Sequence, residues 1–372
     1  MKKIIILGAG FGGLTAAHEF LKYKVDARIT VIEQKQEFYM GLTKLWVMVG
    51  RDKPESYKHR LEELSKKGIN YVNDEVTAIN LKDKRIITRN DQFTYDYLIV
   101  ALGAALAPEK IPGFNQHAFN LYEMEGAAKI YEKIKDFNGK ISLLICGQPY
   151  KCPSAPYETL FLLHDYFKGK VKLSIYTPEP QPLLTAGLKV GEEVIRMLDE
   201  KDIRHHFNHK IMKIEGNIMF FENGNTASAD LIIGIPPHVA PSVLKGLVDE
   251  TGWIPVDPKT LATKFDKVYA VGDNAIVKLP NGKMLPKAGV FAEEQAKIVS
   301  HNIANEMRNN KERVSYNGKG YCFMEMGNGM AGSLEGDFFA EHGPVVELKG
   351  KSAEYFRKKE EFEKERVKEW LN

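Results

Sequence analysis

The sequence has few cysteines, no long apolar run and no excess of charge of either sign. Its 52 Lys and Arg residues nearly balance 49 Asp and Glu residues, and the net charge of +3 excludes the strong basic field expected of a nucleic-acid partner. No apolar stretch approaches the roughly 18 to 20 residues that a membrane-spanning helix needs. Internal repeats and low-complexity segments are also missing. We therefore expect a globular protein of the cytoplasm or of a membrane surface, without nucleic-acid or metal partners.

The N-terminal residues carry a pattern typical of dinucleotide binding. An apolar run, KKIIIL, leads into Gly8-x-Gly10-x-x-Gly13, and residues 14–24 have the pattern of a helix. Gly8 permits the tight turn, Gly10 lets the backbone approach a pyrophosphate, and Gly13 allows the helix to pack closely on the strand. The free N–H groups at the helix start favour an anion. The alternative is a glycine-rich turn without a ligand.

Further residues support a ligand at this motif. A second predicted strand, residues 27–32, ends in Glu33, which lies twenty residues beyond Gly13 and suits a carboxylate that binds ribose hydroxyls. A third, at residues 95–104, ends in small residues that include Ala101 and Gly103. These small residues would let the backbone meet a bound cofactor.

Strand and helix signals alternate along the chain, which predicts an α/β protein with mostly parallel sheets. Residues 1–118 form the first part of a dinucleotide-binding domain, and residues 119–250 repeat its topology in a second Rossmann-like domain. Residues 251–314 return to the first domain. Residues 315–372 form a small C-terminal interface region that ends in a charged helix over residues 352–371.

The second domain departs from the first at its glycine loop. After the predicted strand at residues 141–146, the loop reads Gly147-Gln148-Pro149-Tyr150 and lacks the glycines that a nicotinamide dinucleotide needs for close approach. We therefore predict no tight binding of NADH or NADPH.

Cys152 follows this loop and stands directly before Pro153, at the start of a predicted helix over residues 153–167. A helix N-terminus favours thiolate over thiol, so we expect a reactive sulfur. The alternative for any free cysteine is a small buried hydrophobe, and this alternative suits Cys146, which closes an apolar strand. Cys322 gains interest as a partner for Cys152.

Together these features resemble the sulfide:quinone oxidoreductase and flavocytochrome c sulfide dehydrogenase branch of the flavoproteins with two dinucleotide-binding domains. The resemblance spans nearly the whole chain and implies a glutathione-reductase-like fold. The matching elements are Gly8 to Gly13 with Glu33, Ala101-Leu102-Gly103, Cys152-Pro153-x-x-Pro156-Tyr157-Glu158, Ile235-Pro236-Pro237-His238, Val271-Gly272-Asp273, Pro286-Lys287-Ala288-Gly289, and Cys322.

The resemblance implies an oxidoreductase that contains FAD, with Asp273 near the ribityl chain and Lys287 near the pyrimidine end of the isoalloxazine. It also implies that Cys152 and Cys322 form a redox disulfide. Hydrosulfide or polysulfide attacks one sulfur and leaves a persulfide there, and electrons then pass through FAD to an acceptor. Glu158 is the acid nearest to the disulfide in sequence and is the candidate proton carrier; a solvated helix-face carboxylate is the alternative.

The chain also departs from the family pattern. Microbial members usually have a third cysteine between the first and second domains, whereas this chain has no cysteine before Cys146. Because family flavins can attach through such a cysteine, we predict non-covalent FAD. The close cysteine pair that other flavin disulfide reductases carry on their first long helix is also missing, which excludes those enzymes as close relatives.

The resemblance offers a quinone or a cytochrome c as the electron acceptor. Phe323, Phe338 and Phe339 are the candidate lining of a quinone pocket. The C-terminal helix, with its lysines and Trp370, is a candidate for peripheral contact with the inner face of the cell membrane; a solvated charged face is the alternative. Homo-oligomerisation stays open.

Two other functions compete with sulfide oxidation. One is a type II NADH:quinone dehydrogenase or an NAD(P)H-dependent persulfide or disulfide reductase, which the loop after residue 146 disfavours. The other is a redox-inactive FAD-binding sensor or assembly protein, because folds can outlive functions. The presence of both Cys152 and Cys322 argues against this second alternative.

Overall fold

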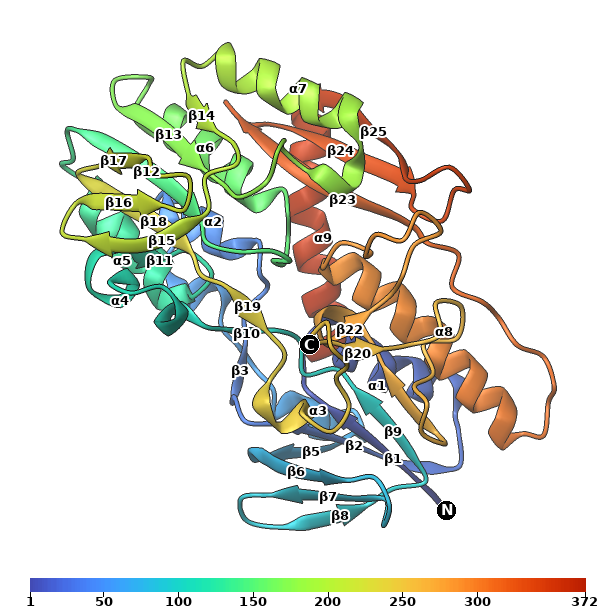
Figure 1. Cartoon of the computed structure of the whole chain (residues 1–372). Helices are drawn as coiled ribbons and strands as arrows, with labels where there is room; N and C mark the ends of the chain where they lie inside the picture. The colour runs from blue at the N-terminus through green and yellow to red at the C-terminus, as the bar shows by residue number, and fades with distance from the viewer.

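The computed structural model describes residues 1–372 and shows two parallel five-stranded sheets, a C-terminal antiparallel sheet and a long C-terminal helix (Figure 1). The first sheet has the strand order β21-β9-β1-β2-β5. Its central strand β1 carries four consecutive buried residues, as expected of a strand covered on both faces. The strands are β1 (Lys2–Leu7), β2 (Ala27–Glu33), β5 (Asn70–Asn73), β9 (Tyr97–Val100) and β21 (Val268–Ala270).

Helices and a small sheet cover the two faces of this first sheet. Helices α1 (Phe11–Tyr23) and α8 (Gly289–Met307) pack against each other on one face. The antiparallel strands β6 (Val76–Asn80), β7 (Arg85–Thr88) and β8 (Gln92–Thr94) contribute Ile86 and its neighbours to an apolar cluster on the other face. Strand β21 comes from residues far along the chain, so the C-terminal half of the sequence completes the first sheet.

The second sheet repeats the arrangement, with the order β11-β18-β12-β13-β14. All its registered strand pairs are parallel. Each parallel sheet and its helices form one unit, the first around β1 and the second around β12. The α/β fold class with two such units is therefore confirmed. The elements of this unit are β11 (Phe119–Asn120), α5 (Met124–Ile134), β12 (Lys140–Ile145), α6 (Ala155–Tyr166), β13 (Lys172–Tyr176), α7 (Leu188–Asp199), β14 (Arg204–His206), β15 (Ile211–Glu215), β16 (Ile218–Phe221), β17 (Thr226–Ser228) and β18 (Leu231–Ile235).

Short elements lie between the strands and helices of the two units. They are β3 (Glu37–Phe38), α2 (Thr43–Met48), β4 (His59–Arg60), α3 (Glu63–Lys66), β10 (Ala105–Leu106), α4 (Phe114–His117), β19 (His238–Val239), β20 (Ile254–Pro255) and β22 (Ala275–Ile276), together with 3-10 helices at Pro54–Tyr57, Pro108–Lys110, Leu184–Ala186, Ser242–Leu244 and Gly272–Asn274. Strands β10 and β19 lie in the connections that lead from the first unit to the second and back, and they pair with each other in antiparallel orientation.

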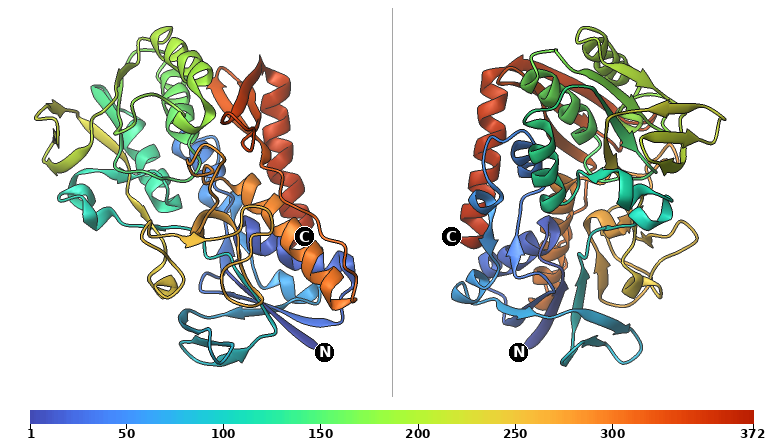
Figure 2. Two further views of the ribbon diagram at one scale, coloured as in Figure 1. Left: turned by 45° about the vertical axis from the view of Figure 1, so that its right-hand side comes forward. Right: turned by 90° about the vertical axis from the view of Figure 1, so that its left-hand side faces the viewer.

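The C-terminal region contains a sheet that the sequence did not predict. Strands β23 (Lys319–Gly327), β24 (Met330–Asp337) and β25 (Val345–Ser352) pair in antiparallel order before α9 (Ala353–Leu371). Helix α6 of the second unit packs against β23. Figure 2 shows α9, in red, running from this sheet to the first unit, where the chain ends. The predicted C-terminal helix is therefore present, and it joins the C-terminal sheet to the first unit.

The apolar face of α9 packs inside the molecule. Phe362, Val367 and Trp370 are all buried, and the Trp370 ring makes edge contacts with Phe11 and Phe38 of the first unit at centroid distances of 5.2 and 5.9 Å. The face that the sequence suggested for membrane contact therefore stabilises the fold instead. No helix in the chain combines the length and apolarity required to cross a membrane.

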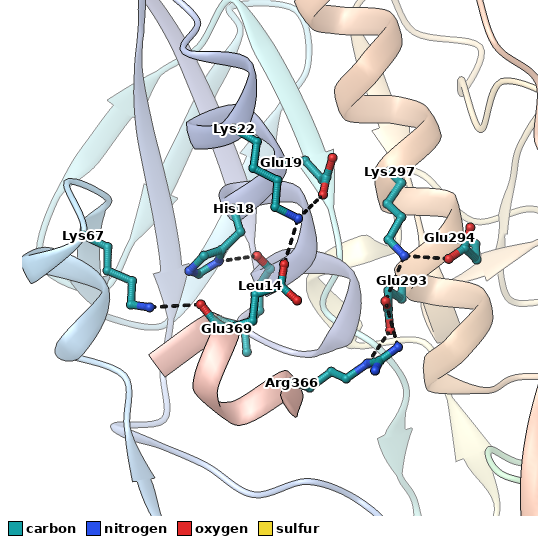
Figure 3. A network of polar contacts seen from close by, with 10 residues as sticks. All are labelled: Leu14, His18, Glu19, Lys22, Lys67, Glu293, Glu294, Lys297, Arg366 and Glu369. Atoms are coloured by element: carbon teal, nitrogen blue, oxygen red, sulfur yellow. Dashed lines mark hydrogen bonds and ion pairs between the residues drawn. The ribbon is translucent and has the colours of Figure 1, made fainter. Parts of the chain in front are cut away.

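Ion pairs hold the same helix in place (Figure 3). The Lys22 ammonium of α1 lies 2.8 Å from the Glu369 carboxylate, and the Lys67 ammonium donates to the Glu369 carbonyl. On the neighbouring turn, the Arg366 guanidinium contacts Glu293 of α8 at 3.4 Å. These partly exposed pairs add modestly to stability, and they set the orientation of α9 against α1 and α8.

Replacing Trp370 with alanine should lower the free energy of unfolding by about 3 to 5 kcal/mol, because the side chain is 1% exposed and its loss leaves a cavity. Urea unfolding followed by circular dichroism measures this change. The control is Val345→Ala, at a position that is 63% exposed, where a change of less than about 0.5 kcal/mol is expected. Equal effects of the two substitutions would contradict the packing of α9.

Candidate active site

The glycine loop after β1 is shaped by two close backbone contacts. Gly8 has a φ of +98°, and a Cβ there would lie 2.4 Å from the Ala101 carbonyl oxygen; a Cβ at Gly13 would lie 1.9 Å from the Gly8 carbonyl oxygen. A side chain at either position would therefore clash. At Gly10, which precedes α1, a Cβ would meet nothing within 4 Å. Open space thus adjoins the helix N-terminus where a pyrophosphate would bind.

Glu33 lies beside this open space. One of its carboxylate oxygens accepts the Ala9 N–H at 3.0 Å, and the other accepts the Lys35 N–H at 2.9 Å. These contacts hold the carboxylate at the end of β2, next to the loop, where it can reach ribose hydroxyls. On the neighbouring strand end, Gly103 has a φ of +68° and open space at its Cβ position. The residues predicted to hold the ADP part of FAD therefore gather at one edge of the first sheet.

Lys287 is buried near Asp273. Its ammonium donates to the Asp273 carbonyl at 2.6 Å and lies 3.5 Å from the centre of the Trp253 ring. Burial lowers the pKa of Lys287 to about 8, although attraction to Asp273 opposes the shift. Burial also raises the pKa of Asp273. We call the glycine loop, Glu33, Gly103, Asp273 and Lys287 the cofactor cradle. The Lys287 cation at one side of the cradle suits the charge that a reduced flavin would carry, so the residues present fit FAD.

Asn274 is a site residue that the sequence did not single out. Its side-chain oxygen accepts the Gly103 N–H at 3.1 Å, and its side-chain nitrogen donates to the Val100 carbonyl at 3.2 Å. It thereby ties the end of β9 to the 3-10 helix that carries Asp273. The only sequence signal was its position next to Asp273.

The loop that carries Cys152 and the segment that carries Lys287 are hydrogen-bonded to each other. The Cys152 N–H donates to the Lys287 carbonyl at 2.7 Å, and Lys151 forms a parallel bridge with Lys287. The two most specific pieces of the family resemblance therefore meet in space. Cys152 has a left-handed φ of +52°, an uncommon conformation for a residue with a side chain.

Cys152 and Cys322 come together although they lie on distant segments. Cys322 is on β23, which packs against α6, and both cysteines are half-buried thiols in this structure. The Ser154 hydroxyl oxygen lies 3.9 Å from the Cys152 sulfur and 3.8 Å from the Cys322 sulfur. The contact between the two thiols lowers the pKa of Cys152 and raises the pKa of Cys322.

The expected helix start at Pro153 is wrong. Helix α6 begins at Ala155 with Ser154 as its N-cap residue, and Pro156 takes the early helical position that favours proline. Cys152 therefore precedes the helix and is not at its first turn. The thiol pKa falls mainly because of the contact with Cys322, rather than through the helix dipole that the sequence suggested.

Glu158 is buried, contrary to the solvated alternative. The carboxylate is 2% exposed, accepts the Ser154 hydroxyl at 2.9 Å and the Glu325 N–H at 3.0 Å, and pairs with Lys359 of α9. Sequence reasoning missed Ser154, Glu325 and Lys359. A signal existed for Lys359, because it lies three residues before Phe362 and eight before Val367, on the apolar stripe of α9.

The three predicted quinone-pocket phenylalanines do not gather in one place. Phe323 lines a groove of about 780 Å³ between β23, β24 and α9, with Tyr321 and Phe362. Phe338 packs on Phe291 with ring centres 5.0 Å apart, and Phe339 packs on Tyr316 instead. Only Phe323 of the three borders the groove.

The loop of the second unit contains side chains where the first unit leaves open space. The Tyr150 hydroxyl donates to the Glu179 carboxylate at 2.9 Å, and the Thr177 hydroxyl donates to the same carboxylate oxygen at 3.2 Å. Glu179 lies just after β13, which corresponds in sheet order to β2, so its position is close to that of Glu33 in the first unit. This carboxylate is already bound by the protein.

Cys146 lies in the core. It is 3% exposed, and burial raises the pKa of its thiol.

Comparison with known proteins agrees with the fold and with the resemblance found in the sequence. Residues 2–296 match the family model described as pyridine nucleotide-disulphide oxidoreductase. The mitochondrial sulfide:quinone oxidoreductase of Dictyostelium discoideum is 27% identical over 86% of this chain and 74% of its own length. The coenzyme A disulfide reductase of Staphylococcus aureus strain RF122 / ET3-1 is 26% identical over 82% of this chain and 71% of its own length.

Among solved structures, the sulfide:quinone oxidoreductase of Aquifex aeolicus superposes with a TM-score of 0.88 at 22% identity, covering 98% of this chain and 90% of that chain. This likeness shows the fold. With the sequence relatives, it confirms the resemblance on which the family assignment from sequence was based.

The asymmetry of the cysteine pair can be tested directly. In the reduced protein, Cys152 should react with iodoacetamide at lower pH than Cys322, because a lower thiol pKa gives a larger thiolate fraction at any given pH. Peptide mass spectrometry across a pH series measures the rate at each site. Cys146 is the internal control and should stay unmodified until the protein unfolds. Faster reaction at Cys322 would reverse the assignment.

Proposed function

This chain belongs to the pyridine nucleotide-disulphide oxidoreductase family, and we propose that within it the chain oxidises sulfide at a Cys152–Cys322 redox disulfide, with FAD as cofactor and a quinone as electron acceptor. The observation that carries the proposal is the meeting of Cys152 and Cys322 beside the segment of Lys287. A sulfur pair next to the cofactor cradle is the arrangement that such chemistry needs.

The difference in pKa between the two thiols indicates which sulfur leaves as a thiolate and which carries the persulfide. In thiol exchange, the thiol with the lower pKa leaves faster, and that thiol is Cys152. Hydrosulfide then attacks the Cys322 sulfur, the bond between the two cysteines breaks, and Cys152 departs as a thiolate. Cys322 carries the persulfide, so sulfide has lost two electrons and the disulfide has gained them.

The protein would hold FAD with the residues of the cradle. Gly10 and the N-terminus of α1 would hold the pyrophosphate, Glu33 would bind the ribose, and Lys287 with Asp273 would lie toward the flavin. When bound, FAD supplies the two-electron acceptor chemistry that lets the disulfide form again. We propose that it is bound without a covalent link, since the first unit carries no cysteine.

The groove beside Cys322 is the candidate acceptor site. Phe323 follows Cys322 directly, and the groove walls include Tyr321 and Phe362. These rings form one part of a lining that is otherwise mostly polar or charged, and a flat aromatic surface suits a quinone ring. A cytochrome c would instead need only a surface contact, so occupancy of the groove distinguishes the two acceptors.

A lipid-soluble quinone also implies a place for the protein. We propose that it lies peripherally on the inner face of the cell membrane. Because Val367 and Trp370 of α9 are buried, this contact has to use another surface or the polar side of the helix. Sulfide or polysulfide would reach Cys322 from the aqueous side.

The nicotinamide-dependent alternatives are disfavoured by the second unit. Tyr150 and Thr177 already bind Glu179, and the loop from Gly147 to Tyr150 has side chains where a pyrophosphate needs bare backbone. A redox-inactive sensor or assembly role is disfavoured because Cys152 and Cys322 lie close together. A protein without redox chemistry does not require two neighbouring thiols.

An anaerobic titration tests the function. Sulfide should bleach the flavin absorbance of the purified holoprotein, and NADH at the same concentration should not. Sulfide can react with the Cys152–Cys322 pair, whereas the second unit lacks the glycine loop that NADH binding needs. Cys152→Ser should abolish the response to sulfide, and Cys146→Ser should leave it intact. Bleaching by NADH alone would transfer the proposal to a nicotinamide-dependent reductase.

The acceptor groove can be tested separately. Phe323→Ala should raise the KM for a soluble quinone several-fold, since one aromatic contact contributes about 0.5 to 1.5 kcal/mol, while reduction of the protein by sulfide stays unchanged. Phe220→Ala, in the second unit's small sheet, is the control. An unchanged KM in Phe323→Ala would place the quinone elsewhere.

A further inference from the structure

Two lysines near Cys152 have no ion-pair partner. Lys44 lies on α2, which packs against α6, and Lys151 directly precedes Cys152 in the chain. Both side chains are half-buried. Glu123 attracts both ammoniums and Asp273 attracts that of Lys151, yet neither acid forms a hydrogen bond or an ion pair with them. Lys44 and Lys151 are therefore partly buried cations whose charge no contacting carboxylate neutralises.

The pKa values of the two lysines reflect this lack of a partner. Burial lowers the pKa of Lys44 to about 7, and repulsion from Lys151 and Lys35 adds to the shift. Burial also lowers the pKa of Lys151. A thiolate at Cys152 opposes both shifts, because an anion attracts the two ammoniums. Since the attraction is mutual, both cations favour the ionised form of Cys152.

Hydrogen bonds to the backbone hold Lys151 and Cys152 in place. The Tyr122 hydroxyl lies 2.8 Å from the Lys151 carbonyl oxygen and 3.3 Å from the Cys152 carbonyl oxygen. Lys151 also forms a parallel bridge with Lys287. Lys44 comes from a segment more than a hundred residues earlier in the chain. The two cations therefore meet beside the sulfur only in the folded protein.

His238 lies in the same cluster but does not add a positive charge. Its Nδ1 donates to the Pro236 carbonyl at 3.0 Å, and its buried Nε2 has no hydrogen-bond partner. The ring makes an edge contact with Tyr122 at a centroid distance of 5.4 Å. Burial, followed by repulsion from Lys151, lowers the pKa of His238 to about 3. The ring is thus neutral near pH 7, and the positive charge in this cluster comes from lysines.

The two sulfurs of the cysteine pair differ in their charged surroundings. Contact with Cys322 is the main cause of the lowered pKa of Cys152, and the Glu158 carboxylate opposes it. The charged groups that chiefly affect Cys322 are Cys152 and Glu158, and both raise its pKa. Attraction to Lys44 and Lys151 therefore adds to a difference that already favours negative charge on Cys152.

We propose that Lys44 and Lys151 stabilise the Cys152 thiolate that leaves the disulfide during sulfide oxidation. The hydrosulfide sulfur bonds to the Cys322 sulfur, the bond between the two cysteines breaks, and its electron pair stays on Cys152. The negative charge of hydrosulfide thus ends on Cys152. Entering and leaving sulfurs lie on opposite sides of the attacked sulfur, so cations beside Cys152 act on the leaving group. This role of the lysines deepens the proposed function and rests on it.

Alkylation of the reduced holoenzyme across a pH series tests this role without sulfide. Lys44→Met and Lys151→Met should each raise the apparent pKa of Cys152 by about one unit, a roughly tenfold slower reaction with iodoacetamide below that pKa. Peptide mass spectrometry measures the rate at Cys152. Lys44→Arg and Lys151→Arg should keep the wild-type profile, because arginine retains the positive charge.

Lys133→Met is the control, since it removes an exposed lysine from the last turn of α5 and should leave the profile unchanged. Profiles of Lys44→Met and Lys151→Met that match this control would overturn the proposal. Loss of FAD from these two variants with an unchanged Cys152 profile would also overturn it, because the lysines would then serve cofactor binding.

A sulfide titration of the same variants separates this inference from the proposed function. Lys44→Met should slow the bleaching of the flavin by sulfide several-fold, because a poorer leaving thiol departs more slowly, and Lys44→Arg should restore the rate. Shifted alkylation profiles in a protein that sulfide does not bleach would refute the function and leave the stabilised thiolate. Equal bleaching rates in the wild type and in Lys44→Met would refute the role of the lysine and leave the function.

Discussion

The buried ion pairs of Lys359 with Glu158 and Glu325 are the interaction on which the arrangement of this molecule depends. They join α9, α6 and β23, three elements that lie far apart in sequence. Burying such charges is expensive, and removing one partner leaves the others unpaired at a cost of about 3 to 5 kcal/mol. The C-terminal helix therefore has to dock wherever α6 and β23 meet, and the two cysteines carried near those elements are brought together by the same contact.

The two parallel units show how one topology can host two chemistries. Four strands of each sheet follow the same order, yet the first unit ends β1 in bare glycines, while the second ends β12 in a loop with Tyr150 and Cys152. In the second unit Tyr150 binds Glu179, the acid near the position that Glu33 takes in the first. A site that binds a dinucleotide with backbone groups can become a site that reacts with a side chain when the glycines are replaced.

The sequence predicted those features that depend on local residues. The glycine loop, Glu33 and the alternation of strands and helices are encoded by neighbouring residues, and the structure has them where expected. The start of α6 was placed two residues early because a proline suits both the first helical turn and the turn before it. The sheet at β23 and β24 was missed, because its many glycines mask a strand pattern. The burial of Glu158 and Lys359 depends on tertiary contacts, which no local window contains.

Hydrogen bonds to the backbone of Cys152 fix the position of its sulfur. Cys152 has a strained left-handed conformation, but its N–H donates to Lys287 at 2.7 Å and its carbonyl accepts the Ala155 N–H at 3.0 Å and the Tyr122 hydroxyl at 3.3 Å. Such strain persists where surrounding bonds determine the conformation. The Lys287 side chain in turn binds the Asp273 carbonyl. A continuous set of hydrogen bonds, made by main-chain groups and by the Lys287 ammonium, thus joins the Cys152 loop to Asp273. Substitutions of the nearby charged side chains can then change the ionisation of the thiol while the sulfur keeps its position, so the chemistry of the site can be tuned independently of its geometry.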